Sequence, residues 1–561
     1  MNYLDARRLT GPNLLWNKPG SILDVSCSEA EVPEVVDAWT VAVRRMLDAV
    51  GWADETLCVH QLSGGVSLAF SAPIDALYAA TEVNEWAWLV ISAAATGESV
   101  PDFDEKVAEI RRAIDEEINP ALLTLERAAI EHGVAFLWDD DDVSIGMGTG
   151  SRCWPFRELP EPTSIDWSGI HDTPAGIVTG TNGKTTTVRL ATHICRVANR
   201  HTGVSCTDWI AVDDRIIDRG DWSGPGGARN VLRQTDVEVA ILETARGGLL
   251  RRGLGLNRAD AALITNIAED HLGDFGSQNL DELLDIKWVV SRAVESGGVL
   301  VLNADDERLV RKSSEFPGEL VWFSLDPDNE IVRQHRARGG LAFITLDSAL
   351  VKAQGEDEDV ICKIDDVSIT MGGAARHNVA NALAAAALTD ALGIPLAAIG
   401  DGLRSVTQED NPGRCNVYEV DGARVLVDFA HNPQAMQALF DMATALPARR
   451  RLLAFGQAGD RPDSLIQEVA RGAWDIGLDA VVVSELEMYH RGRERGEVYA
   501  LIRDELLRNG ADAGQIRHFE EETESLDFAL DWAEPGDLVI MLALGSGQAI
   551  QERLTALVAE N

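Results

Sequence analysis

The sequence predicts an α/β protein made of three successive units, of which the second and third contain parallel sheets. From Pro174 onward, short apolar runs rich in β-forming residues alternate with amphipathic helical patterns, which is typical of a parallel sheet covered by helices. A glycine-rich turn at residues 180–183 also joins one of these apolar runs directly to a helical pattern. We place the three units at residues 1–168, 169–412 and 413–561.

The first unit, residues 1–168, is expected to be an α+β domain with its own core. It contains eight of the 14 tryptophans of the chain, namely Trp16, Trp39, Trp52, Trp86, Trp88, Trp138, Trp154 and Trp167. Apolar residues follow helical spacing over residues 31–50 and 103–132, and the second helix should break at Asn119-Pro120. Proline-rich stretches at residues 154–162 and 172–174 predict a linker to the second unit.

The second and third units show the same alternation of strands and helices. In the second unit, strands are expected at residues 177–179, 237–242, 261–265, 299–302 and 320–323. Helices are expected at residues 280–295, 305–313 and 376–392, and residues 341–371 indicate a short β-meander. In the third unit, the expected strands are 425–429, 452–455, 480–484 and 537–542, with helices at 433–446, 463–473, 498–508 and 548–559. The third unit is therefore predicted to be a Rossmann-like, doubly wound domain.

The composition argues against several classes of protein. The chain has 49 Lys and Arg against 91 Asp and Glu, and this net charge of −42 argues against binding to nucleic acid or to an anionic membrane. Its seven cysteines are scattered without a Cys-x-x-Cys pair, so we expect neither a zinc site nor a disulfide framework. The N-terminus lacks an apolar signal segment, and polar residues and a proline interrupt the apolar run 380–399. We therefore expect a cytoplasmic protein.

The turn at residues 180–183 has the features of a phosphate-binding loop. It follows an apolar run and leads into a helical pattern, so its backbone N–H groups would point toward an anion at the positive end of a helix. Lys184 would then reach the β- and γ-phosphates of ATP, and the Thr185 hydroxyl would bind Mg²⁺. The alternative is a glycine-rich turn with a surface lysine. The residues expected to bind the nucleotide here are Gly180, Thr181, Asn182, Gly183, Lys184, Thr185 and Thr186.

Two further polar groups follow predicted strands, at the edge where α/β sheets place their active sites. The strand at 237–242 leads to Glu243, and the strand at 261–265 leads to His271. Beside a phosphate-binding loop, a carboxylate and an imidazole suit Mg²⁺ bound to nucleotide phosphates. The expected metal ligands are Thr185, Glu243 and His271, and the alternative for His271 is a structural histidine.

Seven short motifs follow one another along the second unit and into the third. They are Thr-Gly-Thr-Asn-Gly-Lys-Thr at 179–185, Glu243, Thr265-Asn-Ile with Asp-His271, Leu302-Asn-Ala-Asp-Asp306, His377-Asn378 with Asn381, Pro412-Gly-Arg414 and Asp428-Phe-Ala-His-Asn-Pro433. Their content and order resemble the Mur ligase family over about residues 174–550. Within that family, residues 243–251, 459–463 and 491–498 are most similar to the cyanophycin synthetases.

The first unit also resembles the N-terminal domain of the cyanophycin synthetases, in residues 11–16 and 146–151. In those enzymes an ATP-grasp domain follows, whereas about 25 residues separate this unit from the phosphate-binding loop here, so no such domain is expected. Residues 545–549 also depart from their pattern. The resemblance thus implies a cyanophycin-synthetase-like N-terminal domain, a Mur ligase central ATP-binding domain and a Mur ligase C-terminal domain. A separate ATP-grasp ligase would be a suitable partner, and an oligomer is compatible with the sequence.

The resemblance implies an ATP-dependent carboxylate–amine ligase that forms an amide or isopeptide bond through an acyl phosphate. The substrates would be an amino acid, a peptide or a cyanophycin-like acceptor. By the same resemblance, Lys184 and Arg414 would hold the β- and γ-phosphates. Asn378 would contact the adenine, and Asp428 the ribose.

The resemblance also implies two metal ions and a modified lysine. Thr185 and Glu243 would bind a first Mg²⁺, and His271 a second. Lys287 lies in the predicted helix 280–295, close to where the family places a lysine carbamylated by CO₂; the alternative is an ordinary helix lysine. The catalytic residues implied are Lys184, Glu243, His271, Lys287 and Arg414.

Four arginines follow Glu243, and their planar guanidinium groups match carboxylates. One or more of Arg246, Arg251, Arg252 and Arg258 would position a substrate carboxylate, the alternative being solvated surface side chains. Two other functions remain open. One is a folylpolyglutamate-synthetase-like γ-glutamyl ligase, and the other is an inactive nucleotide-binding scaffold for a separate ligase. The identity of the carboxylate and of the amine is left open.

Overall fold

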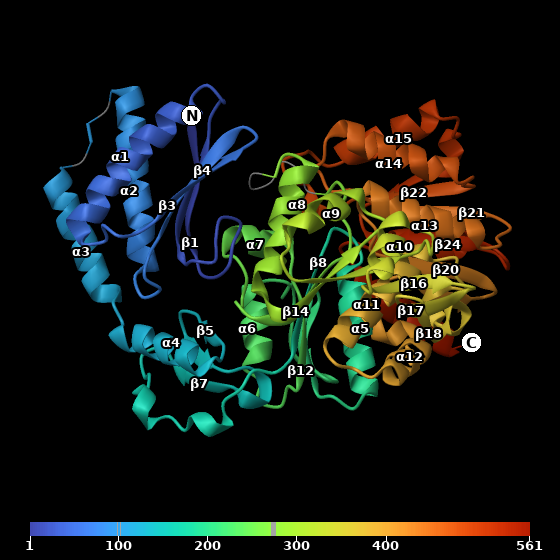
Figure 1. The fold of residues 1–561 in the computed structure, drawn as a ribbon. Helices are drawn as coiled ribbons and strands as arrows, with labels where there is room; N and C mark the ends of the chain where they lie inside the picture. Colours follow the sequence, from blue (N-terminus) through green and yellow to red (C-terminus); the bar gives the residue numbers. More distant parts are fainter. Residues whose placement is uncertain (98, 101, 271–276, 561) are drawn as a thin grey trace.

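The computed structural model describes all 561 residues except 98, 101, 271–276 and 561 (Figure 1). It contains four sheets, of which the largest has 11 strands and lies between the other units (Figure 1). The whole is a mixed α/β protein with a small N-terminal sheet, so the predicted fold class is confirmed. None of the helices in the described part of the chain has the length and apolar character needed to span a bilayer.

The N-terminal unit is an antiparallel sheet covered by helices. The four strands follow the order β1-β2-β4-β3 and comprise β1 Asn2–Leu9, β2 Gly20–Ser26, β3 Leu57–Leu62 and β4 Gly65–Ser71. The helices are α1 Val32–Val50, α2 Leu77–Thr96, α3 Phe103–Glu117 and α4 Pro120–His132. The predicted break at Asn119-Pro120 is confirmed, because a proline cannot donate a hydrogen bond inside a helix but fits its first turn. A small sheet of β5 Phe136–Trp138, β6 Asp142–Ile145 and β7 Arg152–Pro155 follows.

The stretch predicted as a linker is packed rather than free. Apolar side chains from Phe156 to Trp167 lie against the N-terminal core. Two short 3₁₀ turns, Pro162–Ser164 and Trp167–Gly169, order the backbone between them. The proline-rich segment at residues 154–162 therefore packs against the N-terminal core.

The central sheet is parallel in its middle and antiparallel at both ends. The strand order is β11-β10-β9-β12-β8-β13-β14-β15-β16-β17-β18. The strands are β8 Ala175–Thr179, β9 Thr202–Ser205, β10 Trp209–Val212, β11 Arg215–Arg219, β12 Val239–Glu243, β13 Ala259–Ile264, β14 Val294–Asn303, β15 Glu319–Ser324, β16 Leu341–Leu346, β17 Ala349–Gln354 and β18 Asp357–Lys363. The predicted meander at 341–371 is confirmed for β16 to β18, and its first strand pairs in parallel with β15, so it extends the main sheet.

Helices bury both faces of the central sheet. The first face carries α5 Lys184–Val197, α11 Arg376–Ala391 and α12 Leu396–Ser405. The second face carries α6 Pro225–Leu232, α7 Arg246–Arg251, α8 Leu280–Trp288, α9 Glu307–Lys312 and α10 Glu330–Ala337. The predicted helix 280–295 is wrong at its end: α8 stops at Trp288, a 3₁₀ turn follows, and Val294 already pairs with β13. Tertiary strand pairing therefore overrides the helical periodicity there.

The C-terminal unit is a doubly wound sheet, as the alternation predicts. Its six strands follow the order β19-β20-β24-β21-β22-β23, with only β19 antiparallel. They are β19 Asn416–Val420, β20 Ala423–Asp428, β21 Arg451–Phe455, β22 Ala480–Ser484, β23 Ile516–Phe519 and β24 Leu538–Leu542. The helices α13 Pro433–Ala445, α14 Asp463–Asp475, α15 Glu497–Arg508, α16 Glu522–Trp532 and α17 Gly547–Glu560 form a core on each face.

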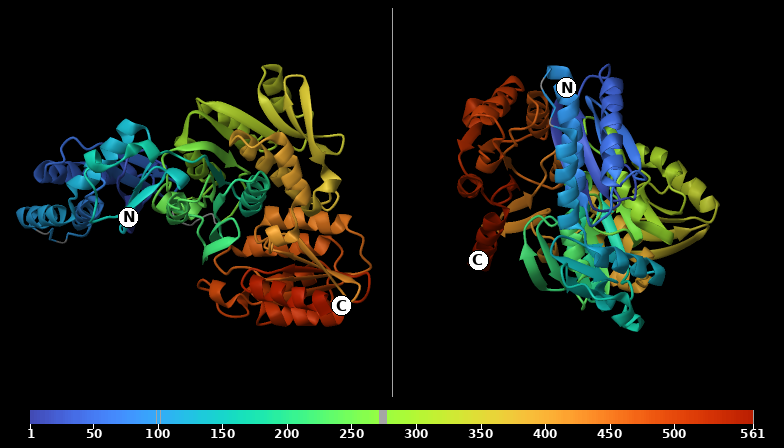
Figure 2. Two further views of the ribbon diagram at one scale, coloured as in Figure 1. Left: turned by 90° about the horizontal axis from the view of Figure 1, so that it is seen from below. Right: turned by 90° about the vertical axis from the view of Figure 1, so that its left-hand side faces the viewer.

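The N-terminal unit docks on the central unit opposite the C-terminal unit (Figure 2). The backbone after β1 runs beside the end of α7, where Leu254 N–H donates to the Pro12 carbonyl at 2.7 Å and Thr10 N–H to the Arg252 carbonyl at 2.9 Å. Gly253 lies between them with a φ of +85°, and a Cβ there would collide with the Pro12 carbonyl. The segment around Pro12 thus forms a docking contact with the central unit.

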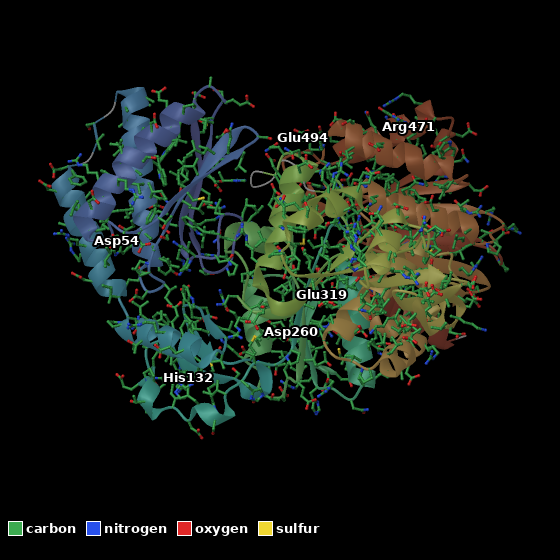
Figure 3. All side chains as sticks on the ribbon, viewed as in Figure 1. Asp54, His132, Asp260, Glu319, Arg471 and Glu494 are labelled. Atoms are coloured by element: carbon green, nitrogen blue, oxygen red, sulfur yellow. The ribbon has the colours of Figure 1, made fainter. Side chains whose placement is uncertain are left out.

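The large negative charge is carried at the surface. Side chains such as Asp54, Glu319 and Glu494, which are labelled in Figure 3, are exposed.

Candidate active site

The turn at residues 180–183, which the sequence predicts to bind phosphate and which is called the phosphate-binding loop below, lies between β8 and α5 and is held from both sides. Gly183 has a φ of +83°, and a Cβ at this position would collide with the Asn381 side chain, so only glycine fits. Asn182 N–H donates to the Asn266 Oδ1 at 3.0 Å, and the Thr265 hydroxyl donates to the Asn182 carbonyl at 2.6 Å. The loop therefore has a fixed backbone at the N-terminus of a 14-residue helix, which is a suitable place for a phosphate.

Lys184 is the first residue of α5 and its amine remains at the loop. Its Nζ donates to the Thr181 carbonyl at 2.9 Å. The ammonium is thus beside the turn where an anion would bind, and it contacts backbone rather than core.

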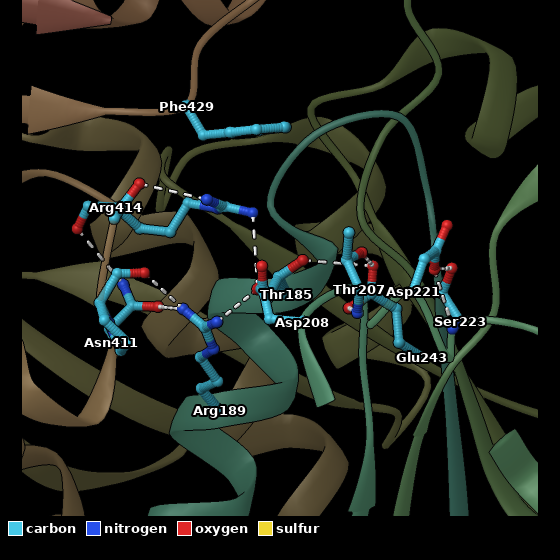
Figure 4. A network of polar contacts seen from close by, with 12 residues as sticks. Thr185, Arg189, Thr207, Asp208, Asp221, Ser223, Glu243, Asn411, Arg414 and Phe429 are labelled. Carbon is cyan, nitrogen blue, oxygen red and sulfur yellow. Dashed lines mark hydrogen bonds and ion pairs between the residues drawn. The ribbon is translucent and has the colours of Figure 1, made fainter. Parts of the chain in front are cut away.

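Glu243 ends β12 and is surrounded by hydroxyl groups. Its side chain is 1% exposed, and it accepts hydrogen bonds from the Thr207 hydroxyl at 2.8 Å and the Thr185 hydroxyl at 3.2 Å (Figure 4). A buried carboxylate among hydroxyls is an all-oxygen donor set, which a hard cation such as Mg²⁺ prefers. His271, the third expected metal ligand, lies outside the described residues. Within the described part of the chain, no group of three His, Cys, Asp or Glu could hold a metal by itself.

Lys287 is buried against the same loop. It lies in α8, its residue exposure is 3%, and its Nζ donates to the Gly180 carbonyl at 2.6 Å. Burial, together with the nearby Lys184 ammonium, lowers the pKa of Lys287 well below its usual range, against the opposing effect of Asp270. A depressed pKa favours the neutral amine, which is the form that reacts with CO₂. Lys287 is therefore not an ordinary exposed helix lysine.

Arg414 faces the loop from the segment that enters the C-terminal unit. Its guanidinium lies over the Phe429 ring at 4.4 Å and 3.9 Å from the Asp208 carboxylate (Figure 4). Asp208 also pairs at 2.5 Å with Arg189, which donates to the Pro412 carbonyl at 2.8 Å. Burial lowers the pKa of Arg189, and the like charge of Arg414 lowers it further. Asp208 thus separates two arginines, one of them bound to the connecting segment.

Asp428 ends β20 of the C-terminal unit, and Asn378 lies in α11. Asp428 accepts backbone hydrogen bonds from Cys415 at 2.8 Å and from Ala430 at 2.7 Å. Asn378 donates to the Ile369 carbonyl at 2.9 Å and accepts from Asn381 at 3.2 Å. Both polar side chains therefore have fixed orientations.

A cleft of about 610 Å³ gathers most of the residues expected from the sequence. Those that line it are Thr181, Asn182, Gly183, Lys184, Thr185, Thr186, Glu243, Lys287, Asn378, Arg414 and Asp428. Gly180 is at the entrance to the loop and is not among the lining residues. The cleft is large enough for a nucleotide together with part of a second substrate.

Of the four arginines after Glu243, Arg246 lines the cleft, whereas Arg251, Arg252 and Arg258 do not. Arg258 is occupied elsewhere, because its Nε pairs with Glu295 at 2.7 Å and with Asp172 at 3.5 Å. Of these four arginines, Arg246 is therefore the one that lines the cleft.

Sequence reasoning did not find the turn between β9 and β10. Its Thr207 contacts Glu243, and its Asp208 contacts Arg189 and Arg414. The one signal was a Thr-Asp pair directly after a short β-rich run, at the same sheet edge as Glu243. Such a pair is common in loops, so the pattern alone does not single it out.

Comparison with known proteins supports the assignment of the two larger units. The family model of the Mur ligase middle domain matches residues 178–389, and the Mur ligase glutamate ligase domain matches residues 413–546. A cyanophycin synthetase from Trichormus variabilis is 35% identical over 386 residues, which are 68% of this chain and 42% of that enzyme. The chain thus spans less than half the length of that relative.

Two further proteins are similar to this chain at lower identity. A UDP-N-acetylmuramoyl-L-alanyl-D-glutamate–2,6-diaminopimelate ligase from Listeria monocytogenes is 23% identical over 381 residues, 66% of this chain and 72% of that enzyme. The structure of E. coli FolC in complex with DHPP and ADP superposes with a TM-score of 0.50 at 19% identity, covering 68% of this chain and 89% of FolC. The similarity to FolC, at 19% identity, shows that the two proteins share a fold.

Proposed function

This chain belongs to the Mur ligase family, and from that premise we propose that it is an ATP-dependent carboxylate–amine ligase. The observation that carries the proposal is the single cleft that brings together a phosphate-binding loop, a buried carboxylate and a buried lysine. Its products would be an amide or isopeptide bond, ADP and inorganic phosphate.

The loop and the connecting segment would bind the nucleotide from two sides. Lys184 and Arg414 supply positive charge to the β- and γ-phosphates, while Asn378 and Asp428 meet the adenine and the ribose. Thr185 and Glu243 would hold Mg²⁺, with His271 contributing to a second ion. When bound, the metal would neutralise charge on the phosphates.

In the reaction, an oxygen of the substrate carboxylate attacks the γ-phosphorus, and the bond to ADP breaks. The amine of the second substrate then attacks the acyl carbon, releases inorganic phosphate and loses a proton. Most of the rate enhancement would come from positioning and from fixed charges, which are Lys184 and Arg414 here. A carbamate on Lys287 would turn a buried cation into an anion next to the Gly180 carbonyl and the loop.

We propose an amino acid, a peptide or a cyanophycin-like chain as the acceptor. The support is the 35% identity to a cyanophycin synthetase and the position of Arg246 in the cleft, where it would meet an acceptor carboxylate. The shared fold with FolC keeps a folylpolyglutamate-like γ-glutamyl ligase as the second candidate. An inactive scaffold would not need Lys184, Glu243 and Lys287 all placed in one cleft.

The test is a phosphate-release screen with ATP and Mg²⁺ against paired amino acids, dipeptides and short poly-aspartate, with a folate acceptor as a separate arm. We expect substrate-dependent phosphate release from the wild type. The Lys184→Ala variant, whose lysine contacts only the loop, should fold normally and lose several kcal/mol of transition-state stabilisation, which abolishes the signal. Wild-type turnover in folded Lys184→Ala would refute the assignment of the loop.

A further inference from the structure

Three hydrogen bonds join the phosphate-binding loop to the C-terminal unit. Asn182 Nδ2 donates to Asn432 Oδ1 at 3.2 Å and to Gln434 Oε1 at 2.7 Å. Asn432 Nδ2 donates back to Asn182 Oδ1 at 2.8 Å. The two asparagines thus exchange both of their amide hydrogen bonds across the boundary between the units.

Both sides of this contact are held by further hydrogen bonds. The backbone N–H and carbonyl of Asn182 are bound to Asn266 and Thr265 of the central unit. Asn432 is 0% exposed, and its Oδ1 also accepts the Ala435 N–H at 3.0 Å, which caps the start of α13. Because a buried amide is costly to leave without a partner, the contact favours one relative position of loop and helix.

Two ion pairs of Asp270 also cross this boundary. Asp270 lies 3.6 Å from Arg461 and 3.7 Å from His431 of the C-terminal unit. These ion pairs draw the units together without fixing their orientation as closely. The reciprocal amide pair has the directionality to do so.

We propose that Asn432 and Gln434 are positioning residues that hold the phosphate-binding loop in its nucleotide-binding conformation through Asn182. The inference rests on the proposed function, since it takes the loop to bind nucleotide phosphates. Arg414 and Asp428, which line the nucleotide cleft, lie shortly before Asn432 in the chain, so docking of the C-terminal unit sets all of these groups together. By linkage, a bound nucleotide must strengthen that docking by the same factor.

The test uses the full-length double variant Asn432→Ser, Gln434→Ala. Serine keeps a neutral oxygen that can cap α13, and neither change adds charge near the phosphates. The matched control is Gln437→Ala, an exposed glutamine one turn further along α13 that donates to Asp441 at 2.8 Å. Affinity for ADP is measured by calorimetry in the presence of Mg²⁺, and compaction of the chain by small-angle X-ray scattering with and without ADP.

We expect the double variant to bind ADP about tenfold more weakly than the wild type and to lose the compaction caused by ADP. The Gln437→Ala control should match the wild type in both measurements. Equal ADP affinity in the folded double variant and the wild type overturns the inference. If the double variant does not fold, the single variant Gln434→Ala, at an exposed position, replaces it in the test. We expect this variant to bind ADP about threefold more weakly than the wild type. Unchanged ADP affinity in this variant would overturn the inference. Failure of the wild type to bind ADP would instead contradict the proposed function.

Discussion

At the scale of single residues, the most unusual group is the buried amine of Lys287. A lysine in such a site is rarely retained as a simple charge, because burial disfavours the ammonium. Its contact with the Gly180 carbonyl places it at the start of the phosphate-binding loop. A substitution at Lys287 therefore tests the proposed reaction.

We predict that Lys287→Ala lowers phosphate release on the order of a hundredfold and that short carboxylic acids partly restore it. The reason is that a small carboxylate can replace the anion that a carbamate would supply. The matched control is Lys312→Ala on α9, whose amine pairs with Asp285 at 2.7 Å away from the cleft, and which should keep wild-type activity. A carbon-13 spectrum of protein in labelled bicarbonate that shows no carbamate signal would contradict the modification.

Asp410 lies next to the segment that joins the two larger units, and its contribution to the free energy of unfolding depends on pH. Burial alone would raise its pKa, but hydrogen bonds from His193 of α5 and from Thr407 outweigh it and lower the pKa to about 2. An unfolded aspartate titrates near 3.9, so this contribution is complete above about pH 4 and disappears as the pH falls toward 2.

We therefore expect Asp410→Asn to destabilise the protein by about 1 kcal/mol at pH 7, after allowance for solvent screening of this half-buried group. The difference in thermal midpoint between variant and wild type should shrink between pH 4 and pH 3. The exposed Asp401→Asn, which removes an i,i+3 pair with Arg404, serves as the control and should change the midpoint little. A difference for Asp410→Asn that stays constant over this range would show that the charge is not responsible.

At the scale of elements, the short helix α7 links the N-terminal unit to the cleft. Its first residue, Arg246, lines the cleft, and the carbonyl of Leu250 accepts from the Arg7 side chain of β1 at 3.1 Å. Backbone hydrogen bonds on both sides of Gly253 complete the contact. We infer that docking of the N-terminal unit stabilises the position of α7.

The Gly253→Ala variant tests this docking. Its Cβ would collide with the Pro12 carbonyl, so we expect a loss of about 1–3 kcal/mol beyond the cost of a positive φ. Gly510→Ala is the matched control, because Gly510 has a φ of +96° with nothing within 4 Å of the added Cβ. Thermal midpoints and protease sensitivity of residues 1–168 are compared. Equal losses in the two variants would mean that the close contact contributes nothing.

At the scale of the whole molecule, the cleft between the central and C-terminal units bears on how many kinds of bond the protein can form. The loop, Lys287 and Arg414 all line one cleft of about 610 Å³. The chain matches 42% of the length of a cyanophycin synthetase. The activity of that whole enzyme therefore cannot be assigned to this chain.

We predict that the pure protein forms one kind of bond. With ATP, Mg²⁺, aspartate and arginine, with or without a short poly-aspartate primer, mass spectrometry should show addition of a single residue type. The physical reason is that one set of phosphate ligands activates one class of carboxylate in one orientation. A product ladder that grows by both residues would refute the single-centre interpretation.

The local pattern of the sequence determined the order and type of most elements from residue 174 onward. Apolar runs and helical patterns located β8, α5, α11 and four of the six strands of the C-terminal unit, whereas β19 and β23 were not predicted. The glycine-rich turn and the polar residues after strands also predicted which side chains would meet, since parallel strands bring their ends to one edge.

Tertiary structure alone decided the rest, because it depends on partners far apart in the chain. The end of α8 was decided by the pairing of Val294 with β13, and the burial of Lys287 by its packing under the Gly180 carbonyl. The contact of Asn182 with Asn432 joins residues 250 positions apart, and no local period or propensity records such a pair. The helices and strands thus follow largely from local sequence patterns. The environment of each functional side chain follows instead from how the units dock.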